Sequence, residues 1–509
     1  MSDESVAALL RSDEPLVVIE AAAGAGKTYQ GAAYARDLAV TLGSGRLLIL
    51  THTHAACTVF AERTAGAGRS VEIKTIDALI AQIATAYHAV LDLPADVSAW
   101  AWQDEGKGFG IMASKVASFL GNRPMVARAL ACRYPFIVCD EHQDSSPDQH
   151  AVVMALHRSG AMLRVFGDPL QSIYDTKSAK AARANRERWE TLKSEAAWDR
   201  LDHPHRWEDG DRELGHWLRK ARENLENGNP IDLTSNVPRS VQIIRADNTA
   251  QTHGLYMLSQ EDRRQIDQNV QSQSQLMILT AQTDLARGLR SFWNRSIPIW
   301  EGHTRNALAD FVSALDERAG NAEAIAAALA AFVSTTAKGF SESSHGRRLI
   351  QEVRNGCAKS TTGKPANIQL IAKCVLEFPD HRGASAAIRL IGELINQRAA
   401  GFDAVYIDYR TEFNEAKQLD RYPSAQGAFA EISRKRAYVR PSPPSKTISS
   451  IHKAKGLECD HSMLIPCDDQ NFRDTPYKRC MLYVALTRAK HSLRLVVPRT
   501  NPSPLIRLS

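Results

Sequence analysis

The sequence predicts an α/β protein with two parallel sheets flanked by helices. In each half of the chain, short apolar runs alternate with segments of helical character, as expected for buried parallel strands and their crossover helices. Polar residues follow these runs, where open α/β sheets place their ligands. The first half contains the runs Leu16–Glu20, Arg46–Thr51, Phe136–Asp140 and Leu163–Gly167. The second half contains Val241–Arg245, Leu276–Thr280, Ser462–Pro466 and Ser492–Pro498.

Two insertions are expected within these halves. Residues 301–440 contain Ala-rich segments at 321–333 and 385–397 with helical spacing and few strand signals, which predicts a mostly helical insertion. A shorter insertion is expected at 86–130. The predicted organisation is therefore a first α/β domain at 1–85 and 131–235 and a second at 236–300 and 441–509.

Composition excludes several classes of protein. The chain has 509 residues, 44% hydrophobic and 24% charged, which argues against global disorder. Its net charge of +6 is compatible with a basic groove for nucleic acid but is small for a histone-like binder. It has no run of ~18 apolar residues, so we expect no membrane association. The acidic N-terminus lacks a signal-peptide core, and the eight cysteines form no CxxC pair, so we expect a cytoplasmic protein without a zinc or iron–sulfur centre.

Residues 21–28 (AAAGAGKT) follow the first apolar run and fit the P-loop pattern except at Ala21, where the pattern has Gly. The two glycines let the backbone turn its N–H groups toward phosphate oxygens. Lys27 is expected to reach the β- and γ-phosphates of ATP, and Thr28 to ligate Mg²⁺. A Gly/Ala-rich loop arising by chance is the alternative. The predicted nucleotide-binding residues are Ala23, Gly24, Ala25, Gly26, Lys27 and Thr28.

Four further residues near predicted strand ends are candidates for the chemistry of hydrolysis. Asp140 would hold Mg²⁺ through water and Glu141 would polarise the attacking water. Gln171, after a GDP turn, would sense the γ-phosphate, and Arg488 is a candidate arginine finger. Taken singly, each segment also fits a plainer interpretation: a solvated acidic loop, a type I turn or a solvated basic face.

Five blocks occur together in this order: AGAGKT, DEHQD (140–144), GDPLQSIY (167–174), HKAKGLE (452–458) and YVALTRAK (483–490). Together they resemble superfamily 1 DNA helicases of the UvrD/PcrA/Rep type. The resemblance covers roughly residues 14–300 and 440–500. It implies two RecA-like domains with ATP and Mg²⁺ in the cleft between them, and 3′→5′ movement on single-stranded or forked DNA.

The resemblance also implies roles for individual residues. Arg206 in LDHPHR would be a second arginine on the γ-phosphate, and His205 would replace the aromatic ring that stacks on adenine. Tyr29 would face the other side of the base, and Glu458, beside Gly456, would contact the ribose. The implied DNA-contact residues are Thr51, His52, Thr53, His54, Thr75, Tyr174 and His452.

Some positions depart from the family pattern. His52 and Thr176 stand where the family has aromatic residues that stack on bases, and no adenine-reading Gln motif precedes the P-loop. With its small insertions and these changes, the chain also resembles the helicase-like subunit of Gabija-type anti-phage systems. This resemblance implies a regulatory role beside a partner nuclease. Two other interpretations are disfavoured: a nuclease motif at Glu72–Lys74, and a metal site formed by His52, His54 and Cys57.

Overall fold

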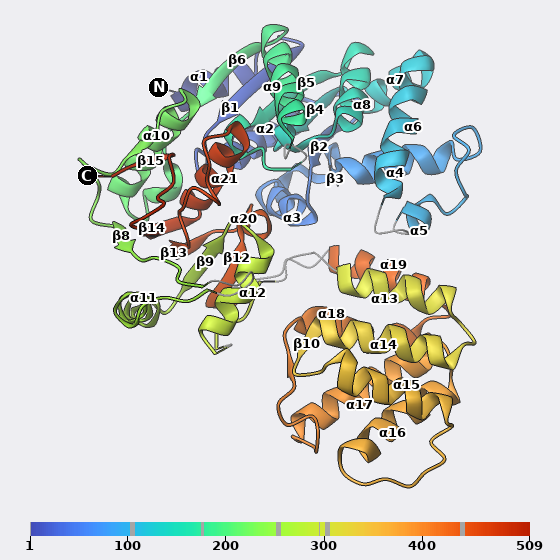
Figure 1. Ribbon diagram of the computed structural model, residues 1–509. Helices are drawn as coiled ribbons and strands as arrows, with labels where there is room; N and C mark the ends of the chain where they lie inside the picture. The colour runs from blue at the N-terminus through green and yellow to red at the C-terminus, as the bar shows by residue number, and fades with distance from the viewer. Residues whose placement is uncertain are drawn as a thin grey trace. The chain divides into compact units, whose positions relative to one another are not determined.

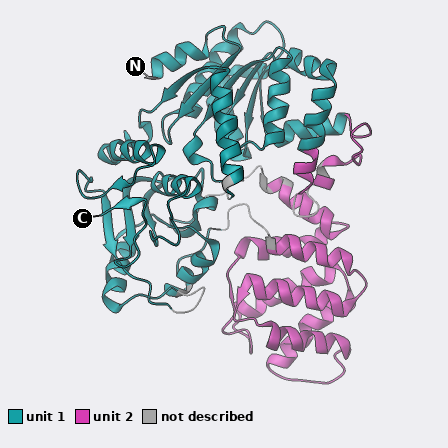
Figure 2. Cartoon of the chain, turned by 45° about the horizontal axis from the view of Figure 1, so that its top comes forward, with its two compact units in different colours: residues 1–86, 113–302, 441–509 teal, residues 87–112, 303–440 magenta. Residues whose placement is uncertain are grey.

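The structure is a computed structural model that describes residues 2–101, 107–174, 178–250, 256–294, 296–300, 306–437 and 443–508. Thr176, predicted at a base-contact position, lies outside these residues. The chain forms two compact units (Figure 2). The first unit comprises 1–86, 113–302 and 441–509, and the second comprises 87–112 and 303–440. The predicted domain boundaries, including the insertion at 86–130, stay predictions.

The first unit contains a six-stranded parallel sheet with the strand order β3-β2-β4-β5-β1-β6 (Figure 1). Its strands are β1 (Leu16–Ala21), β2 (Leu47–Thr51), β3 (Val71–Thr75), β4 (Phe136–Cys139), β5 (Met162–Gly167) and β6 (Ala197–Leu201). Its helices include α1 (Ser2–Leu10), α2 (Lys27–Thr41), α3 (His54–Arg63), α4 (Ile76–Ala86), α7 (Pro124–Arg133), α8 (Pro147–Arg158), α9 (Ala179–Ser194) and α10 (Arg212–Glu226). Helix α6 (Gly108–Asn122) begins in the second unit and continues in the first.

A second parallel sheet in the same unit has the order β12-β9-β13-β14-β8. Its strands are β8 (Val241–Arg245), β9 (Leu276–Thr280), β12 (Lys446–Ser450), β13 (Cys459–Leu464) and β14 (Ala489–Val497). The accompanying helices are α11 (Gln260–Ser272), α12 (Thr283–Phe292), α20 (Ile451–Ala454) and α21 (Pro476–Leu486). The last strand, β15 (Ile506–Arg507), pairs with β7 (Ile231–Asp232), which follows α10.

The predicted fold class is confirmed, because parallel sheets flanked by helices form both halves of this unit. All eight apolar runs identified in the sequence contain strands, whose bounds differ from the prediction by a few residues. β1, β2 and β9 are buried along their whole length, as strands covered on both faces must be. Three strands of these sheets, β3, β6 and β12, were not predicted; in β6 alternate residues are exposed and the apolar run is short.

One apolar cluster joins residues from the two halves of the first unit. It includes Ala23 of the P-loop, Trp207 after β6, and Tyr483 on α21. Helix α21 packs against α10 and against the short turn Pro169–Gln171, as Figure 1 allows the reader to follow. The carboxyl ends of strands from both sheets are therefore held together by buried packing.

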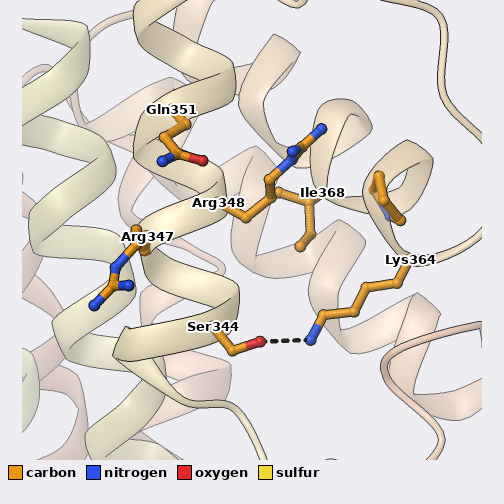
Figure 3. Close-up of a pocket in the computed structure, with 7 residues that line it drawn as sticks. Ser344, Arg347, Arg348, Gln351, Lys364 and Ile368 are labelled. Atoms are coloured by element: carbon orange, nitrogen blue, oxygen red, sulfur yellow. Dashed lines mark hydrogen bonds between the residues drawn. The ribbon is translucent and has the colours of Figure 1, made fainter.

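The second unit is mostly helical. Its helices are α5 (Val97–Ala101), α13 (Asn306–Glu317), α14 (Ala322–Thr336), α15 (Arg347–Arg354), α16 (Lys364–Glu377), α17 (His381–Asn396), α18 (Arg410–Ala416) and α19 (Ala425–Ala437). Two short strands, β10 (Ala337–Lys338) and β11 (Tyr406–Ile407), pair antiparallel. A shallow pocket lies where α15 and α16 meet, and Lys364 Nζ donates to Ser344 Oγ at 2.8 Å across it (Figure 3).

None of the helices in the described parts of the chain combines the length and apolar character needed to cross a bilayer.

Candidate nucleotide site

The loop between β1 and α2 has a backbone that requires glycine at two positions. Gly24 has a φ of 71° and Gly26 a φ of 84°, both in the left-handed region. A Cβ at Gly24 would lie 2.7 Å from Arg206 Cβ and 2.8 Å from a ring atom of Trp207. The loop can therefore turn into α2 and pack closely against the segment after β6 only with glycine at position 24.

Lys27 begins α2 and forms an ion pair with Glu141, which follows β4. Lys27 Nζ lies 2.7 Å from Glu141 Oε1, and the lysine side chain is 9% exposed. Burial lowers the pKa of Lys27, but the charges of Glu141, Asp168 and Asp140 outweigh it and raise the pKa above its ordinary value. Lys27 is therefore held as a buried cation among carboxylates.

The adjacent carboxylates Asp140 and Glu141 differ in their affinity for protons. Burial, reinforced by the charge of Glu141, raises the pKa of Asp140 to about 7. Burial also disfavours the charged form of Glu141, but Lys27 and Lys455 outweigh it and lower the Glu141 pKa. Glu141 has a φ of 52°, which is strained for a residue other than glycine. The two adjacent carboxylates therefore differ in their pKa, and Glu141 is held charged at neutral pH.

A chain of amide and carboxylate groups leads from Glu141 toward the second sheet. Gln143 Nε2 donates to Glu141 Oε2 at 2.5 Å, and Gln143 Oε1 accepts from Asp168 N at 3.0 Å. Gln171 Nε2 donates to Asp168 Oδ2 at 2.8 Å. Gln171 Oε1 accepts from Arg488 Nη2 at 3.4 Å. Three motifs that are distant in sequence therefore meet in one hydrogen-bonded network, and the Lys27–Glu141 ion pair joins the P-loop to it.

Arg488 is held inside the protein at the end of α21. Its side chain is 2% exposed and donates to the carbonyl oxygens of Val484 at 2.8 Å and Leu457 at 3.1 Å. Burial lowers the Arg488 pKa to about 10, with a smaller contribution from Arg206, so the guanidinium stays charged at neutral pH. Arg488 is therefore pre-positioned rather than mobile.

Arg206 links the loop after β6 to both the P-loop and the second sheet. Its backbone N–H donates to Gly24 O at 3.1 Å. Its guanidinium donates to Thr487 O at 2.7 Å and lies 2.8 Å from Glu458 Oε1. Burial opposes the charged form of Glu458, but Arg206 and Lys490 outweigh it and lower the Glu458 pKa to about 2. The two predicted arginines thus lie beside the same residue pair, Thr487 and Glu458.

The residues predicted to contact the nucleoside are also near the P-loop. A Cβ at Gly26 would lie 3.3 Å from His205 Cδ2. Tyr29 is on α2 with 60% of its surface exposed. Thr28 is half-buried at the start of the same helix, and Gly456 has a φ of 81° just before Glu458. Ala25 is buried within the loop.

Three contacts at the site were missed by sequence reasoning. Lys455 Nζ lies 2.6 Å from both carboxylate oxygens of Asp144 and 2.5 Å from Gln171 O. Ala23 N donates to Tyr483 OH at 3.1 Å. All of these residues lie inside the quoted motifs, and that position was the signal in the sequence that could have identified them. Arg222, which lies 3.1 Å from Asp168 Oδ1, belongs to none of the motifs.

The predicted DNA-contact threonines at the ends of β2 and β3 make hydrogen bonds within the protein. Thr51 is 1% exposed, and its hydroxyl donates to Thr53 O at 3.0 Å. The hydroxyls of Thr53 and Thr75 accept from Ala56 N and Ala78 N, which caps the following helices. DNA contact by these threonines stays a prediction.

Two histidines and a tyrosine complete the predicted DNA set. His52 Nε2 lies 3.2 Å from Ser145 Oγ, and burial lowers the His52 pKa to about 4, so the ring is neutral at neutral pH. Burial also lowers the pKa of the half-buried His54. Tyr174, 43% exposed, donates its hydroxyl to His452 O at 3.1 Å, joining the two halves of the unit. Their contact with DNA also stays a prediction.

The raised pKa of Asp140 predicts a proton release. Binding of Mg²⁺ with ADP requires the ionised carboxylate, so at pH 7 binding should release about half a proton from Asp140. Below pH 6 Asp140 is protonated in the free site, so the release should approach one proton. Above pH 8 Asp140 is already ionised, so the release should vanish. Calorimetric titration in buffers of different ionisation enthalpy measures this, and Asp140→Asn should remove it. A wild-type titration with the same proton balance as Asp140→Asn would contradict the prediction.

Family models match two segments of the chain. The UvrD/REP helicase N-terminal domain matches residues 101–188, and the UvrD-like helicase C-terminal domain matches residues 446–496. No curated protein matches the chain. The first segment contains Glu141 and Gln171, and the second contains Glu458 and Arg488, so both matches fall on residues that the structure brings together. The two matched segments are therefore similar to UvrD-like helicase domains, and the structure joins them in one hydrogen-bonded network.

Proposed function

We propose that the protein is an ATP-dependent DNA translocase and helicase that moves 3′→5′ on single-stranded DNA. The observation that carries the proposal is the network from the Lys27–Glu141 ion pair through Gln171 to Arg488. Gln171, which follows a strand of the first sheet and would sense the γ-phosphate, is thereby connected to Arg488 beside the second sheet. The matched helicase domains support this activity.

The residues present suit Mg²⁺ and the phosphates of ATP. Mg²⁺ prefers oxygen ligands: the half-buried hydroxyl of Thr28 would bind the ion directly, and the buried carboxylate of Asp140 would hold it through water. The ion would neutralise charge on the phosphates. The N–H groups of the P-loop would bind phosphate oxygens, and Lys27 would balance their charge.

The remaining residues would carry out the reaction and transmit it. Glu141, held charged and oriented by Gln143, would align the attacking water. Arg206 and Arg488 would stabilise the charge that develops on the transferred phosphoryl group. After hydrolysis the charged phosphate would leave the site, and Gln171 and Arg488 would loosen together. The two RecA-like domains, 1–85 with 131–235 and 236–300 with 441–509, would then open and step along DNA.

Glu141→Gln should spare ATP binding but reduce hydrolysis by at least a hundredfold, because the amide keeps the shape of the side chain but loses the charge that orients water. Fluorescent-nucleotide binding and steady-state phosphate release test the two parts. Glu187→Gln, an exposed change on α9, is the matched control and should match wild type. Near-normal turnover in Glu141→Gln would overturn the assigned role.

ATPase assays with single-stranded, duplex and forked DNA test the proposed function. Single-stranded DNA should stimulate turnover, and a duplex with a 3′ tail should be unwound in preference to one with a 5′ tail. Absence of stimulation by every form of DNA would refute the proposal. Preference for the 5′ tail would refute only the polarity.

The placement of His52 favours a second candidate. Its ring is hydrogen-bonded to Ser145 instead of being free to stack on a base. Loss of a stacking platform costs about 1–3 kcal/mol per base and weakens the grip on single strands. The protein would then be a nucleotide- and DNA-end-sensing subunit that controls a partner nuclease in an anti-phage complex. Co-purification with a nuclease encoded beside it would support this role, and unwinding of long duplexes by the isolated chain would contradict it.

A further inference from the structure

Three potential metal ligands converge on the turn after β6. His203, His205 and Glu208 each offer one ligand atom, and these atoms all lie within 4.8 Å of one another. His203 Nε2 lies 2.7 Å from Glu208 Oε1, and His205 Nδ1 lies 3.3 Å from the same oxygen. Two imidazole nitrogens thus face one carboxylate oxygen.

The local backbone fixes this convergence. His205 N donates to His203 O at 2.9 Å, and Glu208 N donates to His205 O at 3.1 Å, so the segment is a tight turn. Trp207 within the turn is 2% exposed, and its indole N–H donates to Ala489 O at 2.8 Å. The ligands therefore project from a turn anchored in the core, while His203 and Glu208 remain about half exposed and accessible to an ion from solvent.

A fourth residue supplies an independent indication. His205 Nε2 lies 2.6 Å from Asp3 Oδ2 on α1. When this nitrogen donates its proton to Asp3, His205 Nδ1 carries a lone pair that faces the carboxylate oxygen of Glu208. A metal ion between these two acceptor atoms would bind both of them. A histidine that donates its second ring N–H to a carboxylate is the usual arrangement around a protein-bound metal.

We propose that His203 Nε2, His205 Nδ1 and Glu208 Oε1 bind a divalent transition-metal ion of the Zn²⁺ type, oriented by Asp3. Ligand bonds of about 2.0–2.2 Å in a tetrahedral site separate neighbouring ligand atoms by roughly 3.3 Å. His205 Nδ1 and Glu208 Oε1 already have this separation, and the ligand atoms of all three residues lie within 4.8 Å of one another. Imidazole ligands favour Zn²⁺, Co²⁺ or Ni²⁺ over Mg²⁺ and Ca²⁺, which take oxygen. The fourth position would hold water.

This site is distinct from the one proposed for Mg²⁺ at Thr28 and Asp140, and it needs no nucleotide. It adjoins the P-loop through His205, which lies beside Gly26. Bound metal would restrain the ring that is predicted to face adenine.

The test is a titration of the untagged full-length chain, stripped of metal with a chelator, with Co²⁺ as a visible probe and with Zn²⁺ by calorimetry. One equivalent should bind, with a tetrahedral Co²⁺ spectrum that lacks thiolate-to-metal bands. His203→Asn and Glu208→Gln should each weaken binding at least tenfold, and Asp3→Asn should weaken it about tenfold. Circular dichroism would verify that each variant is folded.

His216→Asn, an exposed histidine on the neighbouring helix α10, is the matched control and should bind as wild type does. Absence of binding by the wild type would overturn the proposal. Undiminished binding by both His203→Asn and Glu208→Gln would also overturn it. Failure of the ATPase assays would leave this result unaffected, because no nucleotide is present in the titration.

Discussion

Lys27→Ala is expected to abolish ATP turnover. Lys27 is a buried cation, 2.7 Å from Glu141 and surrounded by three carboxylates. Removing it would leave Glu141 buried without its nearest positive charge and would deprive the phosphates of their principal counter-charge. Loss of one partner of a buried ion pair costs about 3–5 kcal/mol. That cost falls on the stability of the fold, whereas the lost phosphate counter-charge should reduce turnover by roughly a thousandfold, measured as phosphate release at saturating single-stranded DNA.

The control for this variant is Lys180→Ala, which removes an exposed lysine from α9. It should leave turnover unchanged. Thermal denaturation should accompany both variants, because a Lys27→Ala protein that unfolds would lose activity for a trivial reason. A folded Lys27→Ala protein with more than a tenth of wild-type turnover would contradict the assignment of this loop as the nucleotide site.

Arg488→Ala is expected to reduce turnover by roughly 10³–10⁵, the range for an arginine that stabilises phosphoryl transfer. Its guanidinium is already ordered by Val484 O, Leu457 O and Gln171. Little free energy is then required to orient it during the reaction. The loss should appear in kcat, with nucleotide affinity changed much less. Single-turnover hydrolysis and fluorescent-nucleotide binding separate the two.

Arg494→Ala is the matched control for Arg488→Ala. Arg494 is also a buried arginine, 5% exposed, on β14 of the same sheet, but it pairs with Asn269 and Ser492. Both variants lose hydrogen bonds in the interior and should lower the melting temperature. Only Arg488→Ala should lose turnover to this extent. Equal losses in the two variants would show that Arg488 acts only through stability.

The sequence predicted the fold class because its signals are local. A buried parallel strand reads as a short apolar run, and all eight runs that were identified contain strands. β6 escaped because Trp198 and Arg200 alternate with residues that face inward, so its pattern is not a continuous apolar run. The P-loop was identifiable for the same local reason, since Gly24 and Gly26 have backbone conformations that favour glycine.

The sequence could not predict which side chains pair with one another inside the site. Nothing in the spacing of DEHQD indicates that Asp144 pairs with Lys455, more than three hundred residues later. Arg222 on α10 forms ion pairs with Asp168 and Glu20. No sequence motif marks an arginine at this position of a helix as part of the site. The inward orientation of His52 depends on Ser145, which the sequence places ninety-three residues away. Such contacts arise from the packing of strands that are distant along the chain.

The sequence alone predicted two α/β halves, a P-loop, two adjacent carboxylates with different expected roles and two candidate arginines, and the α/β fold is confirmed. These features are encoded in contiguous segments, where backbone conformation and strand burial depend on neighbouring residues. The charge states of buried groups and the contacts between side chains could be obtained only from the tertiary structure. Burial of Asp140 and Glu141 beside Lys27, and the approach of His203, His205, Glu208 and Asp3, result from long-range packing, and electrostatic interactions depend on separation in space and not along the chain.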